Sequence, residues 1–125
     1  MNAAEPQLSA WVAANAGAGK TYTLASRVTR LLLAGAPPER ILCLTYTKAA
    51  AAEMFDRLFK QLGEWSMLSD TALAERIAAI GADPGSKEDL RAARRLFAKA
   101  LETPGGLKIQ TIHAFCQYVL GRFPL

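Results

Sequence analysis

Short apolar runs alternate along the chain with segments in which apolar residues recur every three or four positions. The runs at 9–15 (SAWVAAN) and 40–47 (RILCLTYT) are typical of strands, and the second is rich in strand-forming residues. Residues 20–33 lie between them with the spacing of an amphipathic helix, formed by Leu24, Val28, Leu31 and Leu32. The first 47 residues therefore predict a strand, a helix and a second strand, which we expect to be parallel and covered on both faces.

The remainder of the chain is predicted to be mainly helical. Residues 48–65 begin with four alanines, expected at a tight helix contact, and continue with a wide apolar stripe of Met54, Phe55, Leu58, Phe59 and Leu62. Two more helices, from 69 or 70 to 80 and from 86 or 87 to 101, are separated by the breaker sequence GADPG. A third short strand over 107 to 111 or 112 and a final helix over 114–122 complete the pattern.

Polar positions in the helix that begins near residue 86 predict two further features. Ser86 and Asp89 stand at capping-box spacing, with Asp in the position usually taken by Glu or Gln. The polar face of this helix carries four cations, Arg91, Arg94, Arg95 and Lys99. We expect these side chains to be solvated, with contact to nucleic acid as the alternative.

Composition narrows the class of protein. The chain has 125 residues, a formal net charge of +4, a pI near 9.3, 51% hydrophobic and 21% charged residues, which excludes disorder, collagen and a disulfide scaffold. Cys43, Cys116 and the single His113 are too few to form a zinc site. Because there is no signal peptide and no run of about 18 apolar residues, we expect a cytoplasmic protein with reduced thiols.

One motif carries candidate chemistry, and it consists of Ala14, Asn15, Ala16, Gly17, Ala18, Gly19, Lys20 and Thr21. Glycines at 17 and 19 would let backbone N–H groups approach phosphate oxygens at the start of the following helix. Lys20 would bridge the β- and γ-phosphates, and the Thr21 hydroxyl would bind Mg²⁺. The general P-loop pattern has glycine where this chain has Ala14, and an ordinary Gly-rich turn is the alternative.

Three motifs, taken in order, resemble those of superfamily-one DNA helicases of the UvrD/RecB type. The first, A-x-x-G-x-G-K-T at 14–21, has alanine in place of the first glycine, as in that family. LTYTKAAAAEM at 44–54 looks like the second motif, and TIHAFC at 111–116 looks like the T-x-H motif. Together with the segments RLLLAG, LETPGGLK and RFPL, these motifs make nearly the whole chain similar to the N-terminus of AddA-type subunits of bacterial double-strand-break repair helicase-nucleases.

The resemblance implies a fold and a function. Residues 1–125 would form the first part of an α/β, P-loop RecA-like domain with a short parallel sheet flanked by helices. The function would be that of an ATP-dependent DNA helicase or translocase in double-strand-break repair, with ATP and Mg²⁺ as cofactors, DNA as substrate and an AddB-type partner subunit. Thr45, Tyr46 and Thr47 would lie along single-stranded DNA, with the Tyr46 ring stacked on a base or packed beneath the strand and the hydroxyls near phosphates. His113 would contact the DNA backbone.

Parts of such a helicase have no counterpart in the sequence. Gln7 does not align with the glutamine that reads adenine, and there is no D-E-x-x strand, arginine-finger motif, second lobe or nuclease domain. We therefore expect a piece of a longer protein that is inactive by itself. A small P-loop kinase and a nucleotide-dependent interaction module without turnover are the alternatives; neither the TYTKAAAAEM nor the TIHAFC motif has a role in the kinase.

Overall fold

The computed structural model describes Ser9, residues 18–102 and residues 106–123. The order of elements in these ranges is α1 (Ala18–Leu33), a short 3-10 helix η1 (Pro38–Arg40), β1 (Leu42–Thr45), α2 (Lys48–Trp65), α3 (Asp70–Ala79), α4 (Lys87–Glu102), β2 (Lys108–Thr111) and α5 (Ile112–Gly121). The strand predicted at 9–15 and residues 14–17 of the predicted P-loop lie outside the described residues.

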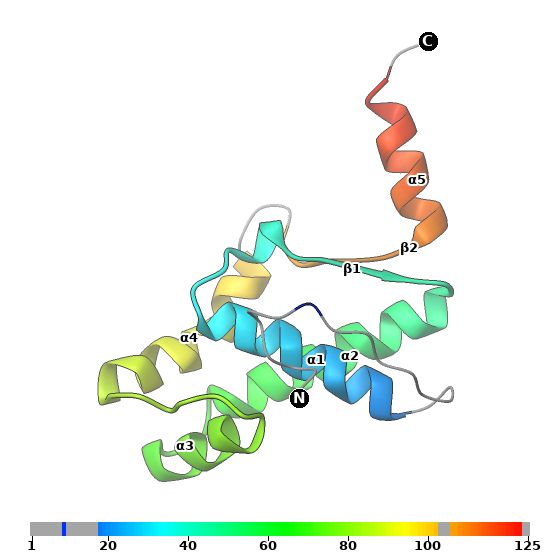
Figure 1. Cartoon of the computed structure of the whole chain (residues 1–125). Coiled ribbons are helices and arrows are strands. Elements are labelled where there is room, and N and C mark those ends of the chain that lie inside the picture. Colours follow the sequence, from blue (N-terminus) through cyan, green and yellow to red (C-terminus); the bar gives the residue numbers. More distant parts are fainter. Residues whose placement is uncertain (1–8, 10–17, 103–105, 124–125) are drawn as a thin grey trace.

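The two strands are parallel, as predicted. Leu42 is paired with Lys108 and Thr45 with Thr111, so the strands end together at their carboxyl ends. Parallel neighbours need a long connection to return the chain to the same edge, and here helices α2, α3 and α4 form it. Figure 1 shows the strands above α1 and α2, and α2 contacts both strands. The short parallel sheet with flanking helices is therefore confirmed.

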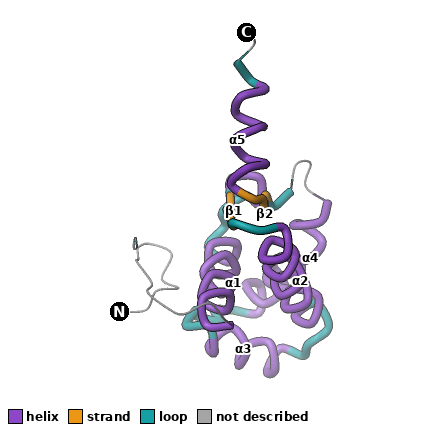
Figure 2. The backbone as a smooth tube through the Cα atoms, turned by 90° about the vertical axis from the view of Figure 1, so that its right-hand side faces the viewer, coloured by secondary structure: helices purple, strands orange, loops and turns teal. Residues whose placement is uncertain are grey.

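The core lies in the helical layer beneath the sheet. Its centre is α2, where Leu58 and Leu62 are fully buried and Trp65 is nearly so. The other helices contribute buried apolar side chains around it: Val28 and Leu32 from α1, Leu73 and Ile77 from α3, and Leu90, Ala93 and Leu96 from α4. Figure 2 shows α5 projecting from the opposite side of the strands, and none of its residues is buried.

The prediction that the second strand is covered on both faces is wrong within the described residues. Leu42 and Leu44 are 40% and 44% exposed, whereas Cys43 and Thr45 on the other face are half-buried. The reason is that α2 packs against one face only, while α5 extends away from the other. The strand is also shorter than predicted, because residues 38–40 form a 3-10 turn that begins at a proline.

The predicted bounds of the helix over 48–65 are confirmed, but the expected role of its alanines is wrong. Ala49, Ala50 and Ala52 are exposed, and Ala51 is half-buried. The buried stripe of α2 begins only at Met54. Ala49, Ala50 and Ala52 line cavities rather than a close helix contact, so these alanines favour the helix through propensity rather than through close packing.

The capping box at the start of α4 is confirmed. The Ser86 N–H donates to Asp89 Oδ2 at 2.8 Å, and the Asp89 N–H donates to Ser86 Oγ at 3.3 Å. The hydrogen bond from the Ser86 N–H, and after it the bond that the Ser86 hydroxyl donates to Asp89 Oδ2 at 3.0 Å, lower the pKa of the Asp89 carboxyl. The pair satisfies two N–H groups that would otherwise lack partners at the start of the helix.

The expectation of a solvated Arg94 is wrong. Its guanidinium forms an ion pair with Asp70, and its Nε donates to the Leu68 carbonyl at 3.1 Å. The side chain is half-buried between α3 and α4, because both partners lie at the start of α3. The hydrogen bond from Arg94 is the main cause that lowers the pKa of Asp70. Arg94 therefore fixes the loop before α3 against α4, while Arg91, Arg95 and Lys99 are exposed as expected.

Candidate nucleotide and nucleic-acid site

The carboxyl ends of β1 and β2 form the edge where the predicted site residues gather. Each strand passes into a helix through a capping threonine. Thr47 Oγ1 accepts the Ala50 N–H at 3.1 Å to begin α2, and Thr111 Oγ1 accepts the Ala114 N–H at 3.1 Å to begin α5. In open α/β sheets, ligands bind outside the carboxyl ends of the strands.

The helix starts near this edge differ electrostatically from the others. The first turns of α1, α2 and α5 contain no acidic residue. In contrast, α3 has Asp70 in its first turn, and α4 has Glu88 and Asp89. A carboxylate at a helix N-terminus neutralises the positive end of the helix dipole, so the dipoles of α1, α2 and α5 are left for an external anion.

Lys20 and Thr21 stand in the first turn of α1, as the P-loop hypothesis requires. Both line a cavity of about 720 Å³ that is also bordered by Thr45 and Tyr46 at the end of β1 and by Glu53 of α2. A Cβ built on Gly19 would meet no atom within 4 Å, so open space adjoins the backbone at the helix start. Two of the residues predicted for the nucleotide and two of those predicted for DNA thus line one cavity.

The three residues of the TYT sequence differ in what they offer to a ligand. Thr45 Oγ1 donates to the Thr47 carbonyl at 3.0 Å, so its proton is already used. The Thr47 hydroxyl accepts a hydrogen bond as the cap of α2, which leaves its own proton for another acceptor. The Tyr46 side chain is 90% exposed. Tyr46 and Thr47 are therefore the members of this motif that are available to a ligand.

His113 occupies the second position of α5 and is exposed. The pairing of Thr45 with Thr111 places the T-x-H motif beside the TYT sequence, although the two are more than 60 positions apart in the chain. His113 is not among the residues that line the cavity shared by Lys20 and Tyr46. The structure thus brings the two predicted DNA motifs to one edge, with His113 outside the cavity wall.

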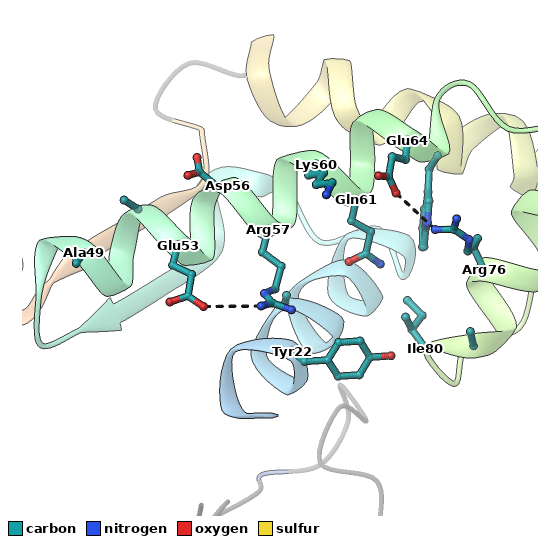
Figure 3. A pocket seen from close by; sticks show the side chains of 14 residues that line it. Tyr22, Ala49, Glu53, Asp56, Arg57, Lys60, Gln61, Glu64, Arg76 and Ile80 are labelled. Atoms are coloured by element: carbon teal, nitrogen blue, oxygen red, sulfur yellow. Dashed lines mark hydrogen bonds and ion pairs between the residues drawn. The ribbon is translucent and has the colours of Figure 1, made fainter. Parts of the chain in front are cut away.

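A second cavity, of about 850 Å³, lies between α1, α2 and α3 (Figure 3). Four of the charged side chains that line it form two ion pairs: Arg57 with Glu53 at 3.7 Å, and Arg76 with Glu64 at 3.5 Å. No residue of the predicted site lines this cavity, and Tyr22 forms part of its wall on α1. Sequence reasoning missed it because its lining comes from three helices and follows no motif.

The described residues also bear on metal and membrane sites. Among them, no group of three or more His, Cys, Asp or Glu side chains is arranged to hold a metal ion. Burial raises the pKa of the Cys43 thiol, which keeps this half-buried cysteine protonated, and Cys116 is an exposed free thiol. No helix in the described ranges is long and apolar enough to cross a membrane.

Comparison with known proteins relates the chain to helicases. The sequence profile of the UvrD/REP helicase N-terminal domain matches residues 2–124. The chain is 33% identical over 112 residues to an ATP-dependent helicase/nuclease subunit of Enterococcus faecalis, with 90% of this chain and 7% of that protein covered. It is 32% identical over 115 residues to the subunit of the same name from Carboxydothermus hydrogenoformans, with 90% and 8% covered.

A shorter match, 43% identical over 53 residues, joins the chain to the equivalent helicase/nuclease subunit of Lactobacillus gasseri, covering 42% of this chain and 4% of that protein. The chain spans only 7% to 8% of the length of the first two relatives named here. No solved structure matches the chain significantly.

Proposed function

The chain belongs to the UvrD/REP helicase N-terminal domain family, and from this premise we propose that it forms the first part of the ATP-binding domain of a DNA helicase that acts in double-strand-break repair. The observation that carries the proposal is the shared cavity, in which Lys20 and Thr21 face the same space as Thr45 and Tyr46. A translocase needs its nucleotide site and its DNA track to be in mechanical contact, and a common wall supplies that contact.

In this proposal, the P-loop residues 14–21 hold ATP and Mg²⁺. Lys20 bridges the β- and γ-phosphates, and the Thr21 hydroxyl binds the metal ion, while backbone N–H groups at the start of α1 bind phosphate oxygens. The absence of an acidic residue in the first turn of α1 and the open space beside Gly19 fit an anionic ligand there. ATP supplies the free energy of its hydrolysis when bound.

Single-stranded DNA follows the edge formed by the carboxyl ends of β1 and β2. Tyr46 stacks on a base, Thr47 donates its free hydroxyl proton to a phosphate, and His113 contacts the backbone near the start of α5. The 90% exposure of Tyr46 supports this role, since a ring that is buried in the protein could not stack on a base. Movement of α1 against β1 would transmit the state of the nucleotide to this track.

The relatives are named as subunits of a helicase/nuclease. We extend this to the present protein as part of the proposal: residues 1–125 belong to a larger polypeptide that works on DNA together with an AddB-type partner. The nuclease activity that the relatives' name includes is assigned to none of the residues described here.

The test is steady-state ATP hydrolysis by the full-length protein with and without single-stranded DNA. Lys20→Ala should abolish DNA-stimulated hydrolysis and leave the thermal melting curve unchanged, because this exposed side chain stabilises transition-state charge and contributes nothing to the core. The matched control is Lys60→Ala, since Lys60 is exposed on α2 and lines the other cavity. Hydrolysis within a few-fold of the parent protein in the Lys20 variant would contradict the P-loop assignment.

A further inference from the structure

A cluster of two cations and one aromatic ring joins the amino end of β2 to the last turns of α5. Tyr118 is 48% exposed, and the Lys108 ammonium lies 5.8 Å from the centre of its ring. The Arg122 guanidinium carbon lies 5.7 Å from the same ring centre, and Arg122 Nη1 donates to the Tyr118 hydroxyl at 2.7 Å. The ring therefore holds both cations at one place on the surface.

Among the described residues, no carboxylate is paired with these cations. Residues 106–125 include no Asp or Glu, and among the described residues neither Lys108 nor Arg122 has a carboxylate within ion-pair distance. Three arginines of the helical layer, Arg57, Arg76 and Arg94, do pair with acidic side chains. Two uncompensated cations beside an aromatic ring form a surface that complements an anion with apolar parts.

The cluster is close to the proposed DNA track but does not lie on the same edge of the sheet. Lys108 is paired with Leu42 at the amino ends of the strands, whereas α5 begins at their carboxyl ends, beside the TYT sequence. Tyr118 and Arg122 lie five and nine positions after His113, and α5 projects from the body with no buried residue (Figure 1). At about 100° per residue, these spacings place Tyr118 and Arg122 on the side of α5 away from His113, so a strand that passes His113 must cross α5 to reach the two cations.

We propose that Lys108, Tyr118 and Arg122 form an additional contact site for single-stranded DNA on the side of α5 away from His113. Lys108 and Arg122 neutralise phosphates, and the Tyr118 ring packs against a base or sugar, so binding does not depend on the DNA sequence. Tyr118 also fixes the position of Arg122 through its hydroxyl group. This inference rests on the proposed function, because it assumes that a DNA strand follows the sheet edge.

The test is fluorescence anisotropy of labelled oligothymidylate with the full-length protein across a series of salt concentrations. The double variant Lys108→Gln/Arg122→Gln should reduce the slope of log affinity against log salt by about 1.4, since each phosphate contact on a single strand contributes about 0.7. Tyr118→Leu should weaken binding about tenfold, whereas Tyr118→Phe, which keeps the ring, should lose much less. Circular dichroism checks that each variant is folded.

Two reference variants separate the inference from the function on which it rests. Arg76→Gln removes an exposed cation that is paired with Glu64 in the helical layer, so its salt slope should match that of the parent. Tyr46→Ala should weaken binding if the track at the sheet edge is real. The double variant and the two Tyr118 variants could all keep the affinity and salt slope of the parent while Tyr46→Ala binds DNA more weakly. That result would overturn the proposed contact site and leave the proposed function standing.

Two other outcomes would be decisive. A parent protein without affinity for oligothymidylate would overturn both the cluster and the proposed function. Exposed apolar side chains also lie near the cluster, with Leu120 at 71% and Phe123 at 68% exposure. If the cluster variants bind DNA normally but change the sedimentation coefficient of the protein, the inference is overturned and the cluster belongs to a protein contact instead.

Discussion

Thr45 and Thr111 are the last paired residues of the two parallel strands, and their hydroxyl groups act in different directions. Thr111 Oγ1 caps α5 by accepting the Ala114 N–H, whereas Thr45 Oγ1 donates to the Thr47 carbonyl at 3.0 Å and lies 3.4 Å from the Gln110 carbonyl of the neighbouring strand. This arrangement joins the ends of both strands and sets the TYT sequence beside the T-x-H motif.

The hydroxyl of Thr45 should therefore stabilise the sheet edge. Thr45→Val keeps the shape of the side chain but removes the donor to two carbonyl groups, so we expect a loss of about 0.5–1.5 kcal/mol in the free energy of unfolding. Urea denaturation of the parent and of the variant measures this difference in the free energy of unfolding. Thr71→Val, at an exposed position of α3, is the control and should change stability less. Equal effects of the two substitutions would show that the Thr45 hydrogen bonds contribute nothing.

Replacing Tyr46 tests the stacking platform itself. Tyr46→Ala should weaken binding of single-stranded DNA by about 1–3 kcal/mol, with little preference among sequences, because every base has a π-face. The protein should stay folded, since this side chain is 90% exposed. Fluorescence anisotropy is the measurement, and Tyr22→Ala, at a 52% exposed tyrosine of the other cavity, is the control. Unchanged affinity with DNA-coupled ATP hydrolysis intact would leave Tyr46 a structural role only.

The centre of the core should be far more sensitive than the open face of the sheet. Leu58→Ala removes a fully buried side chain of α2, and we expect a loss of about 2–5 kcal/mol in the free energy of unfolding. Leu42→Ala, at a strand position that is 40% exposed, should cost clearly less. Chemical denaturation of the two variants measures the difference. A larger effect at Leu42 would mean that the open face is covered in solution.

The ion pair between Arg94 and Asp70 predicts a dependence of stability on pH. The guanidinium lowers the pKa of Asp70 in the folded state, so this carboxylate stabilises the fold above its unfolded pKa of about 3.9 and loses that effect as the pH falls through the lower, folded value. Arg94→Gln should thus be less stable than the parent near pH 7, and the difference should narrow at acidic pH.

Thermal melting from pH 7 down to about pH 3 measures this narrowing around the Asp pKa. The control is Arg95→Gln, which removes the neighbouring exposed cation and should show the same pH dependence as the parent. A stability difference between Arg94→Gln and the parent that stays constant over the whole range would show that the packing of Arg94, rather than the charge of Asp70, is responsible.

Features that depend on neighbours in sequence could be predicted from the sequence alone. The bounds of α2 follow from Thr47 as a cap and from the helical spacing of its apolar positions, and Ser86 and Asp89 form the capping box that their spacing predicts. The parallel pairing of two strands with a helical connection follows from the order of elements. The helix cap and the capping box are set by hydrogen bonds that reach only three residues along the chain, whereas the strand pairing joins distant residues and follows from the order of the elements alone.

Features that depend on what lies opposite a side chain were decided only by the tertiary structure. The apolar run of β1 is the same whether one face or both are covered, and only the position of the helices leaves Leu42 and Leu44 open. The sequence predicts Arg94 to be a solvated cation, and only the packing of α3 against α4 brings Asp70 close enough to pair with it. The shared cavity of Lys20 and Tyr46 likewise arises because packing of α1 beside β1 brings together residues 26 positions apart, and local sequence patterns carry no information on such contacts.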